Sequence, residues 1–355
     1  MKFQHVAHSW IALHPRPQGV IQFIGGAFFG TFGTGIFYRY LLKYFYDREF
    51  TIVILPFRFT FNHYAEAGFL ITEQYEILPE IIRMAKAENY KYSAYLEETN
   101  FYWLGHSIGC KYITLLEGFS ALPDEPQDRQ KFIKSLLVNY RSKENIAKVV
   151  SEIESLIESL QSKVLIAKKL IADYIDRDIS LGDSRIDGDV NSTNSIGWLF
   201  IKDQSSIFLA PENSDTSSAI KSSFLAKLID RLGFGVSPNS VETNTLIIQS
   251  QLFNKLDLIS FKSDTTANQT VNLLKSILGN RLSGKYFSTK GGHLRPLGSQ
   301  FMQHVFNPFD LLYAWLLYLV RIDSAPPKNL APVFQDPQVR DLELEDIIIN
   351  SYKDL

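Results

Sequence analysis

Residues 101–109 read FYWLGHSIG, and this stretch decides the fold. The apolar run over residues 101–104 is typical of a buried strand, and residues 108–117 can form a helix. Between them GHSIG matches G-x-S-x-G, in which a serine occupies a sharp, strained strand-to-helix turn. Gly105 and Gly109 suit such a turn, because larger side chains there would collide. The context favours a nucleophilic Ser107 over an incidental serine in a glycine-rich turn.

Strand-like and helix-like segments alternate on both sides of this motif. Short apolar or β-branched runs predict strands at residues 20–24, 51–55, 206–210, 245–249 and 285–288. Helical spacing of apolar residues predicts helices at residues 37–46, 71–87, 219–232, 271–278 and 308–321. This alternation indicates the α/β class, with a mainly parallel sheet flanked by helices.

One block departs from the alternation. From about residue 130 to residue 179 there is no strand signal, and two amphipathic helical patterns follow each other. We predict a helical cap insertion at residues 125–200, between core segments at residues 1–124 and 201–323; a coiled-coil interaction arm is the alternative. The proline-containing residues 324–355 are expected to form an extended tail.

A serine hydroxyl needs a base to become a good nucleophile. His293 lies in KGGHL, directly after the last expected strand. In folds that carry the G-x-S-x-G turn, the catalytic residues follow the chain order serine, acid, histidine. For the acid, Asp257 is favoured because it follows the expected strand at residues 245–249. Asp264 and Asp215 are the alternatives.

The oxyanion of an acyl-transfer reaction needs two backbone N–H donors. The residue after the nucleophile, Ile108, is expected to give one, and Gly26 or Ala27, in the loop after residues 20–24, the other. A phosphate-binding loop is the alternative for this glycine-rich segment. Because it has neither the GKS/T nor the dinucleotide-binding pattern, nucleotide binding is not favoured. We predict no cofactor and no metal.

Composition narrows the remaining choices. The 355 residues are 45% hydrophobic, which is enough for a sizeable core, and the net charge is −2 with 36 basic and 38 acidic residues. No basic footprint indicates a nucleic-acid partner. The longest apolar run, residues 311–320, is too short to span a bilayer, which takes about 20 residues. With one cysteine and no signal peptide, a soluble cytoplasmic protein is expected, with peripheral membrane contact left open and no prediction of oligomeric state.

The motifs together resemble the α/β-hydrolase superfamily, and more narrowly the family called domain of unknown function 1350, typical of cyanobacteria and chloroplasts. The resemblance rests on FIGGAF at residues 23–28, GHSIG at 105–109, LAP at 209–211 followed by SDT at 214–216, and GHL at 292–294. It covers roughly residues 20–320 and implies the fold and a possible Ser-His-acid triad. It implies no established substrate.

The leading functional expectation is a serine hydrolase that forms an acyl-enzyme on Ser107. The substrate would be a small-molecule ester or thioester, and the aromatic content suggests an apolar, lipid-like acyl group. An acyltransferase using the same intermediate is the second hypothesis. A non-catalytic binding or scaffold protein on a hydrolase fold is the third.

Overall fold

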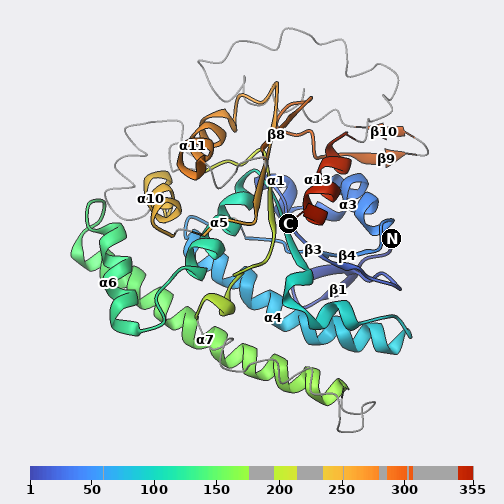
Figure 1. Cartoon of the computed structure of the whole chain (residues 1–355), viewed down its shortest axis with the longest axis horizontal. Helices are drawn as coiled ribbons and strands as arrows, with labels where there is room; N and C mark the ends of the chain where they lie inside the picture. The colour runs from blue at the N-terminus through green and yellow to red at the C-terminus, as the bar shows by residue number, and fades with distance from the viewer. Residues whose placement is uncertain are drawn as a thin grey trace.

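The computed structural model describes residues 1–58, 60–175, 196–213, 235–250, 252–279, 286–301, 304–306 and 343–354. Within these ranges eight strands form one sheet in the order β1-β2-β4-β3-β5-β6-β7-β8 (Figure 1). The strands from β4 to β8 in that order are parallel, whereas β2 is antiparallel to β4 and β1 to β2. The strands are Gln4–Val6, Ser9–Ala12, Gly19–Ile24, Phe50–Ile54, Phe101–His106, Ser206–Leu209, Leu256–Phe261 and Tyr286–Thr289, numbered β1 to β8 in chain order.

Helices cover both faces of this sheet, as the α/β prediction requires. On one side α4 contacts α5, α5 contacts α10, and α10 contacts α11; on the other, α3 contacts α13 (Figure 1). These helices are α3 Arg39–Tyr46, α4 His63–Ala87, α5 Ile108–Ser120, α10 Ser240–Ser250, α11 Asn268–Leu278 and α13 Glu343–Asp354. Two short helices, α1 Ala27–Thr31 and α2 Thr34–Phe37, precede α3, and a separate hairpin pairs β9 Ser299–Phe301 with β10 His304–Phe306.

Two expectations about the sheet were wrong. The sheet begins with β1 and β2, before the first expected strand at residues 20–24. Residues 245–249 lie in helix α10, and the strand of this region is β7, about ten residues later. In α10 the buried residues recur at helical spacing, with Thr243, Leu246, Ile247 and Ser250 inward and Ile248 exposed. A short run such as TLIIQ fits either structure by periodicity alone.

The part of the block between β5 and β6 that the structure describes is mainly helical, as predicted. It contains α6 Pro126–Leu137, α7 Lys143–Ile175 and a short 3-10 turn, Ile196–Leu199. In Figure 1 the long α7 runs beside α4, and these two helices are in contact. The role of this block as a cap over the site stays a prediction.

The C-terminal prediction needs correction. Residues 343–354, expected to be part of an extended tail, form helix α13, whose buried apolar side chains are Leu344, Ile348, Ile349 and Tyr352. Their spacing of about four residues is the reason for a helix. The expected helices at residues 219–232 and 308–321 lie outside the described residues, as does the tail over residues 324–342.

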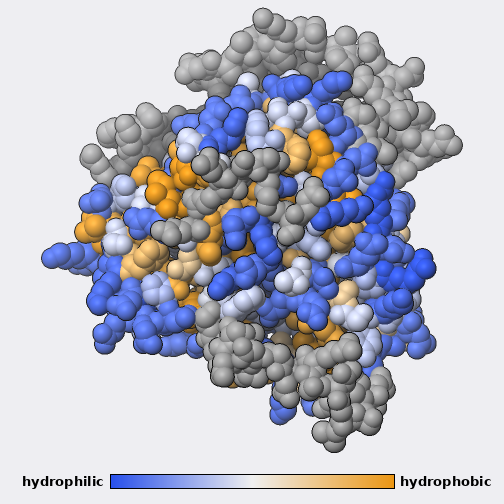
Figure 2. All heavy atoms as spheres, viewed as in Figure 1, coloured by the Kyte–Doolittle hydropathy of each residue, from blue (hydrophilic) through white to orange (hydrophobic). Residues whose placement is uncertain are grey.

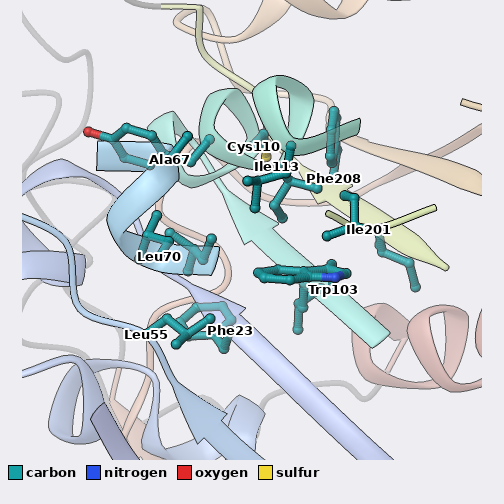
Figure 3. Packing of buried hydrophobic residues seen from close by; sticks show 14 of the residues in the cluster. Phe23, Leu55, Ala67, Leu70, Trp103, Cys110, Ile113, Ile201 and Phe208 are labelled. Carbon is teal, nitrogen blue, oxygen red and sulfur yellow. The ribbon is translucent and has the colours of Figure 1, made fainter. Parts of the chain in front are cut away.

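The hydrophobic core lies between the sheet and its helices. Figure 3 shows Trp103 of β5 near Ile201, with Cys110 and Ile113 of α5 and Phe208 of β6 packed in the same region. The indole Nε1 of Trp103 donates a hydrogen bond to Gln204 Oε1 at 2.6 Å, which satisfies the polar atom of this buried ring. The strand that leads to the GHSIG motif is therefore anchored in the centre of the molecule.

The surface is mixed in polarity. Figure 2 shows hydrophobic residues among the hydrophilic ones over the region of α10, where Val241 and Ile248 are exposed. Among the described helices, none has the length and apolar character needed to cross a membrane.

Glycine is required at residue 109 by close packing. A Cβ there would lie 2.2 Å from the carbonyl oxygen of Ile24 and 2.8 Å from that of Gly25. Real Cβ atoms do not approach backbone this closely, so α5 can start directly beside the end of β3 only because residue 109 lacks a side chain.

We therefore expect Gly109→Ala to lower the free energy of unfolding by about 1–3 kcal/mol, the usual range for overpacking. Denaturant unfolding measures this change. Gly35→Ala in α2 is the control, because a Cβ there would meet only side-chain atoms at 3.6 Å or more. Equal stability of the two variants would contradict the packing argument.

Candidate active site

Ser107 lies at the turn between β5 and α5, where its backbone has φ 55° and ψ −123°. This left-handed φ is unusual for a residue with a Cβ and marks local strain. Hydrogen bonds hold the turn: Ser107 N–H donates to Leu209 O at 3.0 Å, and Ser107 O accepts from Cys110 N at 3.1 Å. The serine thus sits at the N-terminus of a 13-residue helix, as the motif predicted.

His293 lies beside the serine. Its Nε2 is 2.9 Å from Ser107 Oγ, although 186 residues separate the two in sequence. Both side chains are almost completely buried. The structure thus brings together the two residues that sequence reasoning selected as nucleophile and base.

The carboxylate beside His293 belongs to Asp264, not Asp257. Asp264 Oδ2 is 2.9 Å from His293 Nδ1, and its other oxygen accepts backbone hydrogen bonds from Thr266 and Ala267 at 2.8 and 3.1 Å. Asp257 is the second residue of β7, paired in register with Ile207. The favoured acid is therefore corrected: because the strand is residues 256–261, the loop after it carries Asp264. Asp215 lies outside the described residues.

The surroundings of Asp264 define the state of the histidine. Burial on its own would raise the pKa of Asp264, but the hydrogen bond and charge of His293, with the two backbone N–H groups, lower it below the usual value. The ionised carboxylate accepts a hydrogen bond from Nδ1–H, so a neutral His293 carries its proton on Nδ1, and its Nε2 can accept the Ser107 hydroxyl proton.

The predicted oxyanion donors occupy the expected loops. Ile108 is the first residue of α5, and Ala27 is the first residue of α1. Backbone N–H groups at first helical positions have no partner within their helix. Gly26 is close to the nucleophile, since a Cβ on it would lie 3.3 Å from Ser107 Cβ, but its N–H donates to Tyr38 Oη at 2.9 Å. Ala27 is therefore the remaining candidate from this loop.

A buried hydrogen-bond chain connects this loop to the histidine loop. His106 Nε2 faces His293 O at 2.8 Å and must donate to it, since a carbonyl oxygen can only accept. Nδ1 of the neutral ring therefore accepts from Tyr38 Oη at 2.7 Å, and Tyr38 Oη accepts from Gly26 N–H. Burial and the neighbouring His293 lower the pKa of His106 to about 3, consistent with this neutral tautomer. Sequence reasoning gave neither Tyr38 nor His106 a role, and no sequence pattern marked Tyr38.

A second carboxylate reaches the nucleophile. Glu212 Oε2 is 3.2 Å from Ser107 Oγ and 4.0 Å from His293 Nε2. It follows β6, whose C-terminal end lies beside that of β5. Its position directly after this strand is the signal in the sequence that could have identified Glu212, because the carboxyl ends of neighbouring parallel strands meet at one edge of the sheet.

Within the described ranges, no group of three or more His, Cys, Asp or Glu residues could hold a metal ion.

The strand order, with the serine after β5, the acid after β7 and the histidine after β8, defines an α/β-hydrolase fold. Residues 2–173 match the model of a family described as a protein of unknown function, DUF1350. The resemblance to that family is confirmed over this part of the chain. No curated protein matches the sequence.

Several solved structures match the chain at low sequence identity and low TM-score. An esterase from Thermogutta terrifontis, Est2, is 12% identical with a TM-score of 0.36, covering 92% of this chain and 90% of its own. The α/β hydrolase MGS-MChE2, from the metagenome of sediments of the lagoon of Mar Chica, is 10% identical with a TM-score of 0.33, covering 83% and 90%. The thioesterase domain from the curacin biosynthetic pathway is 9% identical with a TM-score of 0.33, covering 83% and 94%. Likeness at this level says nothing of this chain's substrate.

The two candidate acids make a matched pair of variants. Asp264→Asn should lower the reaction of Ser107 with a fluorophosphonate, and any esterase turnover, by up to about 10⁴-fold, because an amide no longer fixes the histidine tautomer. Asp257→Asn changes a buried carboxylate in β7, the strand before Asp264, and should leave both rates within a few-fold of wild type. Equal losses in both variants would contradict the assignment of Asp264.

Removing the Tyr38 hydroxyl tests the series of hydrogen bonds that connects the Gly26 loop to the His293 loop. Tyr38→Phe leaves the Gly26 N–H and His106 Nδ1 without their buried partner, so the free energy of unfolding should fall by about 1–3 kcal/mol. The fluorophosphonate rate at Ser107 should fall as well, because Ala27 and His293 would be held less firmly. Tyr95→Phe, which removes another buried hydroxyl, hydrogen-bonded to Thr51 at 2.7 Å, is the control. It should lose stability and keep the labelling rate.

Proposed function

We propose that this protein is a serine hydrolase that cleaves a carboxylic ester or thioester through an acyl-enzyme on Ser107. The observation that carries the proposal is the hydrogen-bonded series Ser107 Oγ, His293 and Asp264, with both distances at 2.9 Å. Nucleophile, base and orienting acid in this arrangement are the three parts that acyl transfer from serine requires.

The reaction would run in two halves. Ser107 Oγ attacks the acyl carbonyl carbon while His293 Nε2 takes the hydroxyl proton, and the negative charge forms on the carbonyl oxygen near the Ile108 and Ala27 amides. The bond to the leaving alcohol or thiol then breaks, and His293 returns the proton to that group. A water molecule repeats the sequence on the acyl-enzyme, releasing the carboxylic acid and restoring Ser107.

An apolar acyl group fits the surroundings of the oxyanion loop. Phe28 of α1 and Phe32, the residue that follows this helix, are each 61% exposed, and Ile36 of α2 is 65% exposed. The two phenyl rings pack at 5.6 Å between centroids, directly after Ala27 in the chain. Clustered exposed apolar side chains favour binding of an apolar partner, here the acyl chain of the substrate.

Labelling with a fluorophosphonate tests the mechanism without knowledge of the natural substrate. Wild-type protein should be labelled at Ser107, and Ser107→Ala should not be labelled. With an ester that the wild type hydrolyses, Ser107→Ala and His293→Ala should each lower turnover by several orders of magnitude, and the double variant no further, because the two residues act as a unit.

Unchanged turnover in His293→Ala would overturn the proposed mechanism. His63→Ala is the control, since this buried histidine also follows a strand but contacts Tyr112, on the face of α5 that packs against α4. It should keep the labelling rate even if stability falls.

A further inference from the structure

The mechanism above leaves the Glu212 carboxylate without a task. Ser107 has one hydroxyl proton and two acceptors within reach, His293 Nε2 at 2.9 Å and Glu212 Oε2 at 3.2 Å. Asp264 already orients the histidine from the other side. A second carboxylate at the nucleophile is therefore not needed for the proton transfers.

Hydrogen bonds hold the backbone at Glu212 and at the residue after it. Glu212 N–H donates to Ser107 O at 3.2 Å, and Asn213 N–H donates to Thr270 Oγ1 at 3.3 Å. The Asn213 side chain donates in turn to Ser240 O and Asn244 Oδ1, both at 3.1 Å. Glu212 is thus tied to the nucleophile turn and, through its neighbour, to α10 and α11.

No cation of the described residues balances the charge of Glu212. Among the described residues, no lysine or arginine forms an ion pair with it, and its contact with His293 is 4.0 Å long. Its side chain is 21% exposed, so solvent or a ligand can reach it. In such a partly buried place, two charges a few Å apart interact much more strongly than in water.

This charge opposes the reaction of a neutral substrate. The negative charge develops on the carbonyl oxygen, which is attached to the carbon that bonds to Ser107 Oγ and so lies within a few Å of Glu212, and like charges repel. A positively charged group carried by the substrate would remove the repulsion and gain an ion pair. Glu212 therefore favours cationic substrates and disfavours anionic ones.

We propose that Glu212 forms a subsite for a cationic group, an ammonium or guanidinium, carried by the substrate a few bonds from the carbonyl that Ser107 attacks. The subsite rests on the proposed function of Ser107. It adds a charge requirement next to the reacting bond, whereas the apolar side chains of α1 and α2 contact another part of the substrate.

Three para-nitrophenyl esters of nearly equal size test the subsite: β-alanyl, butanoyl and succinyl, which end in an ammonium, a methyl and a carboxylate group. In the wild type we expect kcat/KM for the β-alanyl ester to exceed that for the butanoyl ester by at least about tenfold, equivalent to about 1.4 kcal/mol. The succinyl ester should be the poorest. Glu212→Gln should bring the β-alanyl to butanoyl ratio close to one and improve the succinyl ester.

The control is Glu158→Gln, which removes the same charge from the exposed face of α7 and should keep the wild-type order. Glu212→Ala is the second variant, and Ser107 labelling by a fluorophosphonate shows whether each variant is folded. A pair of fluorophosphonates ending in an ammonium or a methyl group gives the same ratio without turnover.

The outcomes separate the two proposals. Ser107-dependent reaction with equal ratios in wild type and Glu212→Gln overturns the cationic subsite and leaves the hydrolase mechanism intact. Absence of Ser107 labelling in folded wild-type protein overturns the hydrolase mechanism, and the subsite with it.

Discussion

At Ser107 the backbone has φ 55° and ψ −123°, and such a conformation costs a residue with a side chain about 1–3 kcal/mol. The surrounding structure compensates for this cost. Gly109 lets α5 start against the end of β3, and the Ser107 N–H and C=O groups bond to Leu209, Cys110 and Glu212. The strain is useful because it lifts Oγ out of the strand, toward the loops that follow β7 and β8.

Two loops beside the nucleophile, after β3 and after β8, are connected by buried hydrogen bonds in addition to packing. The chain from Gly26 through Tyr38 and His106 to His293 O joins the loop after β3 to the loop after β8. Because every donor and acceptor in this series of hydrogen bonds has a partner, its protons have one arrangement. A fully satisfied buried network of this kind makes its surroundings rigid and helps to specify one geometry.

Much of the centre of this fold can be predicted from the sequence, and the errors lie toward the edge of the sheet. The GHSIG motif and His293 can be recognised locally, because each follows a strand-like run and has glycines beside it. Residues 245–249 were misassigned because a five-residue apolar run has no decisive period, and that error moved the expected acid from Asp264 to Asp257. Tyr38 and Glu212 were missed because their roles depend on which loops meet in space.

The helix α13 ties residues from near the end of the chain to the strand of the nucleophile. Tyr352 Oη donates to the carbonyl oxygen of Trp103 at 3.0 Å, across 249 residues, and its ring packs on Tyr102 with centroids 4.8 Å apart. Contacts between such distant residues form slowly, because the long loop between them must close first. During synthesis β5 therefore leaves the ribosome well before α13, the helix that completes its contacts. Until residues 343–354 emerge, the nascent chain exposes the back of its central strand, and a chaperone that binds apolar strands has that interval in which to act.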